Sequence, residues 1–145
     1  MNIEELLENY NMNKVNIEIA KKSIEDLEDD LVSIRTSKID GMPKAKGFST
    51  SNIEMQIINI EEKKNKIKKY KKKLEYEITI VDNLLNILKK RYRDIIEMRF
   101  FERKDIEEIS VIKNRNRDTI NKNISKSISI LQNEYNKIVE RIETL

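Results

Sequence analysis

The chain has 145 residues, of which 38% are charged and 38% are apolar, with two Gly and one Pro. This balance is typical of long, solvated helices and argues against a thick globular core. The sequence contains neither Cys nor His, so it excludes disulfides and thiolate metal sites and lacks the commonest general base. We therefore expect no enzyme and no cofactor. No apolar run is long enough to cross a bilayer, which predicts a cytoplasmic protein without a membrane partner.

The net charge of +3 is unevenly distributed along the chain. Residues 1–35 carry nine acidic and four basic side chains, whereas residues 51–80 carry eight Lys and five Glu. An acidic first segment is thus followed by a basic second one.

The first segment has an apolar series at alternating steps of three and four, from Ile3 to Ile34, in which Asn13 is the one polar residue. This narrow heptad seam predicts a helix over residues 3–36. Asn2 followed by Glu5 has the pattern of a capping box at its start.

The periodicity stops between residues 37 and 50, where both glycines and the proline fall, so we expect a loop there. We interpret the loop segment Asp40 to Ser49 as a plain connector. The alternative is a partner contact made by Met42, Pro43, Lys44 and Phe48.

Ser51 and Glu54 form a second capping-box pattern, and the seam then resumes, with Lys64 and Lys71 at two of its positions. It predicts a helix over residues 51–88. Residues 1–88 are therefore expected to form a long helical hairpin, or coiled coil, with the acidic helix beside the basic one. The same seam is equally consistent with an intermolecular coiled coil. We expect a homodimer, and the sense of the helix pairing stays open.

Residues 89–145 change to short helices with wider apolar faces, which predicts a three-helix unit containing a helix-turn-helix. Its first helix is expected to end near residues 102–104 and to bury Ile95, Ile96, Met98 and Phe100 or Phe101. The second helix is expected to begin at Asp105, an N-cap paired with Glu108, and to bury Ile106, Ile109 and Ile112.

The turn that follows has Asn114 where the backbone needs a left-handed conformation, and Asn116 as the cap of the third helix. The apolar residues of that helix leave a polar face on its opposite side. Arg suits guanine, Asn suits adenine and Lys neutralises phosphate, so this face predicts binding to double-stranded DNA. The candidate DNA-binding residues are Lys113, Arg115, Asn116, Arg117, Asp118, Asn121, Lys122, Ser125 and Lys126. A further basic cluster either adds phosphate contacts or is a solvated helix face: Lys89, Lys90, Arg91 and Arg93.

The segments 98–102, 106–110 and 116–120 resemble the region 4 helix-turn-helix of bacterial sigma-70 factors. This resemblance implies that the helix from Arg117 enters the major groove, with Arg117, Asn121 and Lys122 contacting bases or phosphates. Two positions depart from the family pattern, because Asn114 replaces its usual Gly and Arg115 its usual apolar residue. The preceding part of the chain does not resemble the promoter-melting region 2, so we do not expect a complete sigma factor.

The domain order, together with the segment Ile39-Asp40-Gly41-Met42-Pro43-Lys44, is similar to phage late transcription regulators of the ArpU and RinA type. That resemblance implies an activator of late genes that acts with the RNA polymerase of a bacterial host cell. A small terminase-like DNA-packaging subunit is the main alternative, since it also joins a helix-turn-helix to a helical oligomerisation region. A coiled-coil interaction protein whose helix-turn-helix no longer binds DNA is a third interpretation.

Overall fold

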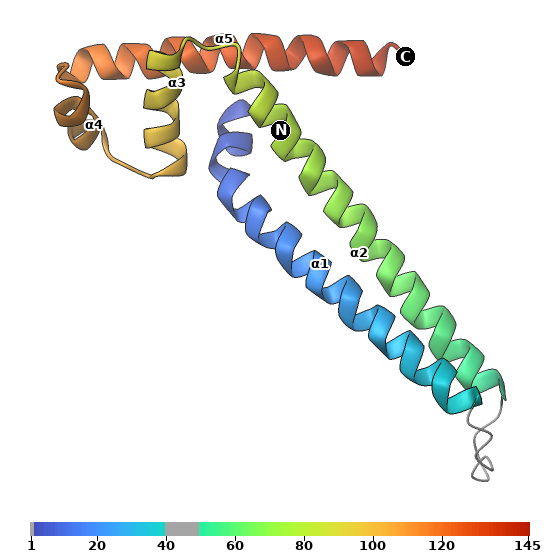
Figure 1. Ribbon diagram of the computed structural model, residues 1–145. Coiled ribbons are helices and arrows are strands. Elements are labelled where there is room, and N and C mark those ends of the chain that lie inside the picture. The colour runs from blue at the N-terminus through green and yellow to red at the C-terminus, as the bar shows by residue number, and fades with distance from the viewer. Residues whose placement is uncertain (1, 40–49) are drawn as a thin grey trace. The chain divides into compact units, whose positions relative to one another are not determined.

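The computed structural model describes residues 2–39 and 50–145, and every element within these ranges is a helix. In chain order they are α1 (Ile3–Ile39), α2 (Thr50–Leu85), α3 (Lys90–Ile96), the π-helical turn η1 (Glu97–Phe101), α4 (Ile106–Lys113) and α5 (Arg117–Glu143) (Figure 1). The predicted all-α fold with a long N-terminal hairpin is confirmed. Of the loop predicted over residues 37–50, residues 37–39 and 50 are helical, and the segment from Asp40 to Ser49 lies outside the described residues. Within the described ranges, no helix is long and apolar enough to cross a membrane.

The chain divides into two compact units. One unit combines the residues up to Asn13 with residues 76–145, and the other comprises residues 14–75. The change in periodicity predicts a domain boundary between residues 88 and 89, and this division into functional domains stays a prediction.

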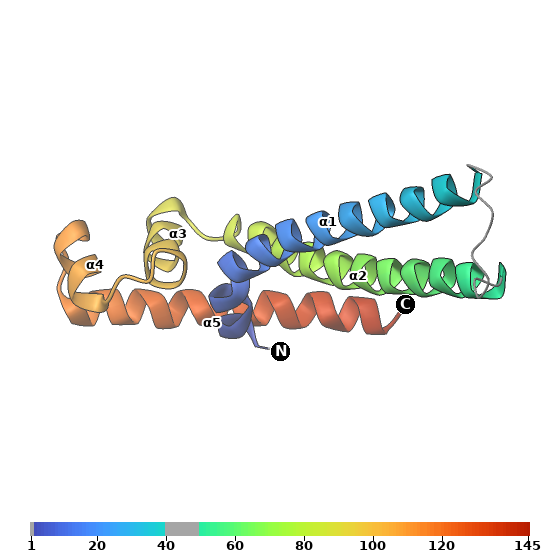
Figure 2. The same ribbon diagram turned by 90° about the horizontal axis from the view of Figure 1, so that it is seen from below.

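In the unit of residues 14–75, α1 and α2 run side by side in opposite directions (Figures 1 and 2). The predicted seam supplies the buried contacts, which on α1 include Ile17, Ile24 and Leu31. Ion pairs join the two helices, between Lys64 at a seam position and Glu28 at 3.5 Å, and between Arg35 and Glu61 at 3.3 Å. The Arg35–Glu61 pair is exposed, and an exposed ion pair adds little stability. The hairpin therefore depends mainly on its buried apolar residues.

The other unit is built around the first turns of α1. Ile3, Leu6 and Leu7 are almost fully buried in one cluster with Leu84 of α2 and Leu131 of α5. The predicted cap is present, since the Glu5 backbone N–H donates to Asn2 Oδ1 at 2.8 Å. Apolar burial and the cap together fix the start of α1 in this unit.

The second helix differs from its predicted bounds at both ends. It begins at Thr50, one residue before the predicted start, and it ends at Leu85 instead of residue 88. After Leu85 the chain tightens, with Ile87 N–H donating to Leu84 O and Leu88 N–H donating to Leu85 O. Leu88 nevertheless stays buried. Apolar periodicity continues to Leu88, so it does not distinguish a continuing helix from a tight turn that buries the same side chain.

The predicted first helix of the C-terminal part is α3 continued by η1. Ile95 and Ile96 are buried, and both Phe100 and Phe101 pack against the core. The wider π-helical turn places these adjacent aromatic side chains against one apolar cluster.

Candidate nucleic-acid interface

The turn between α4 and α5 has the predicted local geometry. Asp105 caps α4 by accepting a hydrogen bond from the Glu108 backbone N–H at 2.8 Å. Asn114 ends α4 in the left-handed region, with φ 52° and ψ 47°. Asn116 then caps α5 by accepting from the Thr119 backbone N–H at 2.8 Å. Local hydrogen bonds therefore define the end of each helix that borders the turn.

Further hydrogen bonds close this turn from inside. The Arg115 N–H donates to Ser110 O at 3.1 Å, and the Ser110 hydroxyl donates back to Arg115 O. Arg115 therefore contributes its backbone to the turn while its side chain stays exposed. Although Arg115 stands where the sigma-70 region 4 pattern usually has an apolar residue, the turn keeps these hydrogen bonds.

A small apolar cluster orients α5. Ile95 of α3, Ile109 of α4 and Ile120 of α5 are buried together, with Met98, Ile106 and Ile124 packed around them. Figure 2 shows α3 and α4 lying along the first half of α5. Because one side of α5 is buried in this cluster, its other side faces solvent.

The predicted burial of Ile112 is wrong. Its side chain is 51% exposed, and neighbouring Val111 is 81% exposed. Ile106, Ile109 and Ile112 are spaced by three residues, and two such steps rotate a side chain by about 120° from the starting direction. With Ile109 at the centre of the cluster, Ile112 is carried off the buried face.

Most of the predicted DNA-binding side chains lie on the solvent side of α5. The structure leaves six of them exposed: Arg117, Asp118, Asn121, Lys122, Ser125 and Lys126. The core residues Ile120, Ser127 and Leu131 occupy the opposite side of the helix. The predicted polar face therefore exists as a surface of the folded chain.

Two of the predicted basic residues already have partners. Lys113 is half-buried and its Nζ lies 3.4 Å from Asp94, which directs this side chain toward α3. Arg117 lies 3.2 Å from Glu107, and both side chains of this pair are largely exposed. Because an exposed pair is worth little, Arg117 can exchange Glu107 for another acceptor at small cost.

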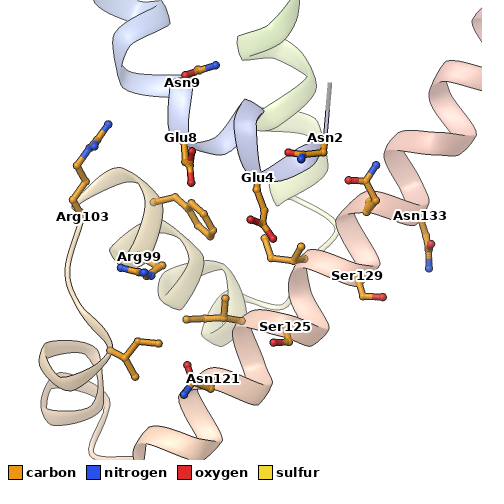
Figure 3. A pocket seen from close by; sticks show the side chains of 15 residues that line it. Asn2, Glu4, Glu8, Asn9, Arg99, Arg103, Asn121, Ser125, Ser129 and Asn133 are labelled. Atoms are coloured by element: carbon orange, nitrogen blue, oxygen red, sulfur yellow. The ribbon is translucent and has the colours of Figure 1, made fainter.

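An open cavity of about 1010 Å³ lies beside this face, between the first turns of α1, the η1 region and the middle of α5 (Figure 3). Asn121 and Ser125 form part of its α5 wall, and Glu4 and Glu8 form part of its α1 wall. Its apolar lining is contributed by Phe100, Ile106, Ile124 and Ile128. The exposed polar face of α5 therefore borders a groove whose other wall comes from the first turns of α1.

Four charged residues of this groove were not among the predicted site residues: Glu4, Glu8, Arg99 and Arg103. Arg103 adopts a positive φ of 56°, and the following Lys104 N–H donates to Met98 O at 2.9 Å. No sequence signal brings Glu4 to α5, because that approach depends on packing between segments more than 100 residues apart.

Residues 78–130 match the family model described as Sigma-70, region 4. The matched segment extends from the last turns of α2 through α3, η1 and α4 into the first half of α5, and so contains the turn and the exposed polar face. Comparisons with curated proteins and with solved structures give no match. This part of the chain is thus similar to sigma-70 region 4, a DNA-binding helix-turn-helix of transcription.

Proposed function

We propose that the chain is a sequence-specific regulator of transcription that places the first half of α5 in the major groove of double-stranded DNA. One observation carries this proposal, namely an exposed polar helix face, held by a capped turn, inside the segment that matches sigma-70 region 4. Arg117 is suited to guanine and Asn121 to adenine, while Lys122 and Lys126 are suited to phosphates. The proposal assigns the chain no catalytic activity and no cofactor.

We further propose late-gene activation in a phage or prophage, together with host RNA polymerase in the bacterial cytoplasm. Support comes from the order of a long helical hairpin followed by a helix-turn-helix, as in the ArpU and RinA type regulators that the sequence resembles. The polymerase is the natural partner of a module similar to sigma-70 region 4.

We also propose that the chain is a homodimer. The α1 side of the heptad seam is largely buried in the hairpin, while Ile53, Ile57 and Ile60 on α2 are half-buried. Because both sides of the seam pack within the hairpin, we place the dimer contact on another surface. Met12, Val15 and Ile19 form an exposed apolar series at steps of three and four on α1, with exposed fractions of 53–59%. Light scattering tests this point: a dimer supports the activator, a ring of many subunits supports the terminase-like alternative, and a monomer contradicts both.

Selection of bound duplexes from a random pool tests the DNA-binding proposal. We expect the wild-type chain to enrich a preferred site and to bind it less tightly as salt rises, because phosphate contacts release counterions. Arg117→Ala with Lys122→Ala should weaken binding to that site by about tenfold or more, since one base contact is worth about 1–3 kcal/mol.

The matched control is Arg141→Ala with Lys137→Ala, which removes the same charges from the other end of α5. The control should keep its affinity within about twofold, as surface substitutions away from a contact usually do. Absence of a preferred site, or equal binding by the two double variants, contradicts the proposal.

A further inference from the structure

We infer that Glu4 and Glu8 of α1 form an acidic wall that weakens DNA binding by α5 and excludes a backbone phosphate from one side of the recognition groove. This inference rests on the proposed function, since it names residues outside the helix-turn-helix that set how DNA meets α5.

The wall and the recognition face line the same groove. Figure 3 shows the Glu4 and Glu8 side chains on α1 beside the groove whose α5 wall carries Asn121 and Ser125. If DNA contacts the α5 face, its phosphates come close to this groove. Charges within a Debye length of about 8–10 Å at physiological salt are only partly screened from one another. The two carboxylates therefore repel a phosphate there.

The wall is held firmly in place. Ile3 is 1% exposed, and its backbone N–H donates at 2.9 Å to the side-chain oxygen of Gln132 on α5. Leu6 and Leu7 are buried in the same cluster as Leu131 of α5. In addition, Asn11 Nδ2 donates to the backbone oxygen of Phe101 on η1 at 2.8 Å. Moving Glu4 and Glu8 away from α5 would break these contacts. The repulsion is therefore built into the folded unit.

The groove has charges of opposite sign in its other part. Arg99 and Arg103 contribute to the η1 side of the lining. Arg99 Nη1 donates to Lys104 O at 3.3 Å, which keeps the guanidinium beside the groove. A phosphate is favoured near these arginines and disfavoured near Glu4 and Glu8. The groove thus favours one position of the DNA backbone relative to α5.

A purely structural role predicts a different result. Glu4 lies in the first turn of α1, where a carboxylate stabilises the positive N-terminal end of the helix, so removing its charge should lower stability slightly. That effect alone leaves DNA affinity unchanged or reduced. Tighter DNA binding by a less stable variant is explained only by the acidic wall.

The test measures the affinity of the full chain for its selected duplex, using Glu4→Gln with Glu8→Gln. We expect about three- to tenfold tighter binding, from repulsion of the size found for surface charge interactions. Glu18→Gln with Glu25→Gln is the matched control, because it makes the same charge change on the same helix but at residues that do not line the groove. The control should stay within about twofold of the wild type.

A second variant tests the other part of the groove. Arg103→Gln should weaken binding about threefold and reduce the salt dependence by about one phosphate contact. Should Glu4→Gln with Glu8→Gln be poorly folded, Glu8→Gln alone replaces it, with Glu25→Gln as its control. If the wild type binds the duplex, and the groove variant binds it with the same affinity as its control, this inference is contradicted and the proposed function is not. No binding by any of the proteins contradicts the proposed function and this inference with it.

Discussion

The Tyr10 hydroxyl on α1 donates a hydrogen bond of 2.6 Å to a carboxylate oxygen of Asp82 on α2. The same ring stacks on Phe101 of η1, with 4.4 Å between the ring centroids and 14° between the planes. Tyr10 therefore joins α1, α2 and η1 within one compact unit. Burial, followed by the hydrogen bond and charge of Asp82, raises the pKa of Tyr10 to about 12.

Tyr10→Phe should lower the free energy of unfolding by about 1 kcal/mol, because the ring stays while its hydrogen bond is lost. The wild type has an additional pH dependence, since the pKa of Tyr10 in the folded chain lies above its ordinary value of 10.0. The stabilisation that Tyr10 contributes is complete below its ordinary pKa of 10.0, and it is lost as pH rises toward the folded-state pKa of about 12. Urea unfolding at about pH 8 and about pH 11 should show a smaller difference between the two proteins at the higher pH. A constant difference contradicts the contribution of Tyr10 ionisation.

Asp105→Ala removes the acceptor for the Glu108 backbone N–H and should cost about 1 kcal/mol of stability. Asp105→Asn keeps a capping oxygen and is the control, with a smaller expected loss. Thermal unfolding followed by circular dichroism compares them. Equal losses in the two variants would show that the charge of Asp105, and not its capping bond, stabilises the helix.

The left-handed backbone of Asn114 makes its position selective. Asn114→Val should destabilise the chain by about 1–2 kcal/mol, since a β-branched residue is strained at positive φ, whereas Asn114→Gly should be neutral or stabilising. Denaturant unfolding measures both changes. If Val and Gly prove equivalent there, the turn does not have the conformation described.

Ile120→Ala should cost about 2–5 kcal/mol, because this fully buried side chain joins α5 to Ile95 and Ile109. Ile130→Ala on the same helix is the control, since Ile130 is 37% exposed and should lose much less. Similar losses at the two positions would contradict the assignment of Ile120 to the core that orients the polar face.

The features that follow from local interactions were predictable from the sequence. The caps at Asn2, Asp105 and Asn116 and the left-handed Asn114 each depend on hydrogen bonds or backbone preferences within a few residues. The exposed polar face of α5 follows from helical periodicity in the same way.

The features that depend on distant segments were not predictable. Helix α5 extends to Glu143, and its Tyr135 and Ile138 pack against the cluster that contains the start of α1. The placement of Glu4 beside Ser125 in one groove also requires that packing. Helical periodicity identifies a buried face but does not identify the segment that covers it.

Site-directed cleavage tests most directly whether the first half of α5 lies against DNA. The sequence contains no Cys, so Asn121→Cys introduces a single attachment point for an iron chelate that cleaves nearby DNA. Glu140→Cys provides the matched exposed position in the other half of the same helix. We predict that the chelate at position 121 cuts the selected duplex within the bound site and that the chelate at position 140 cuts it much less. Equal cutting from both positions, or cutting only from position 140, would contradict the account.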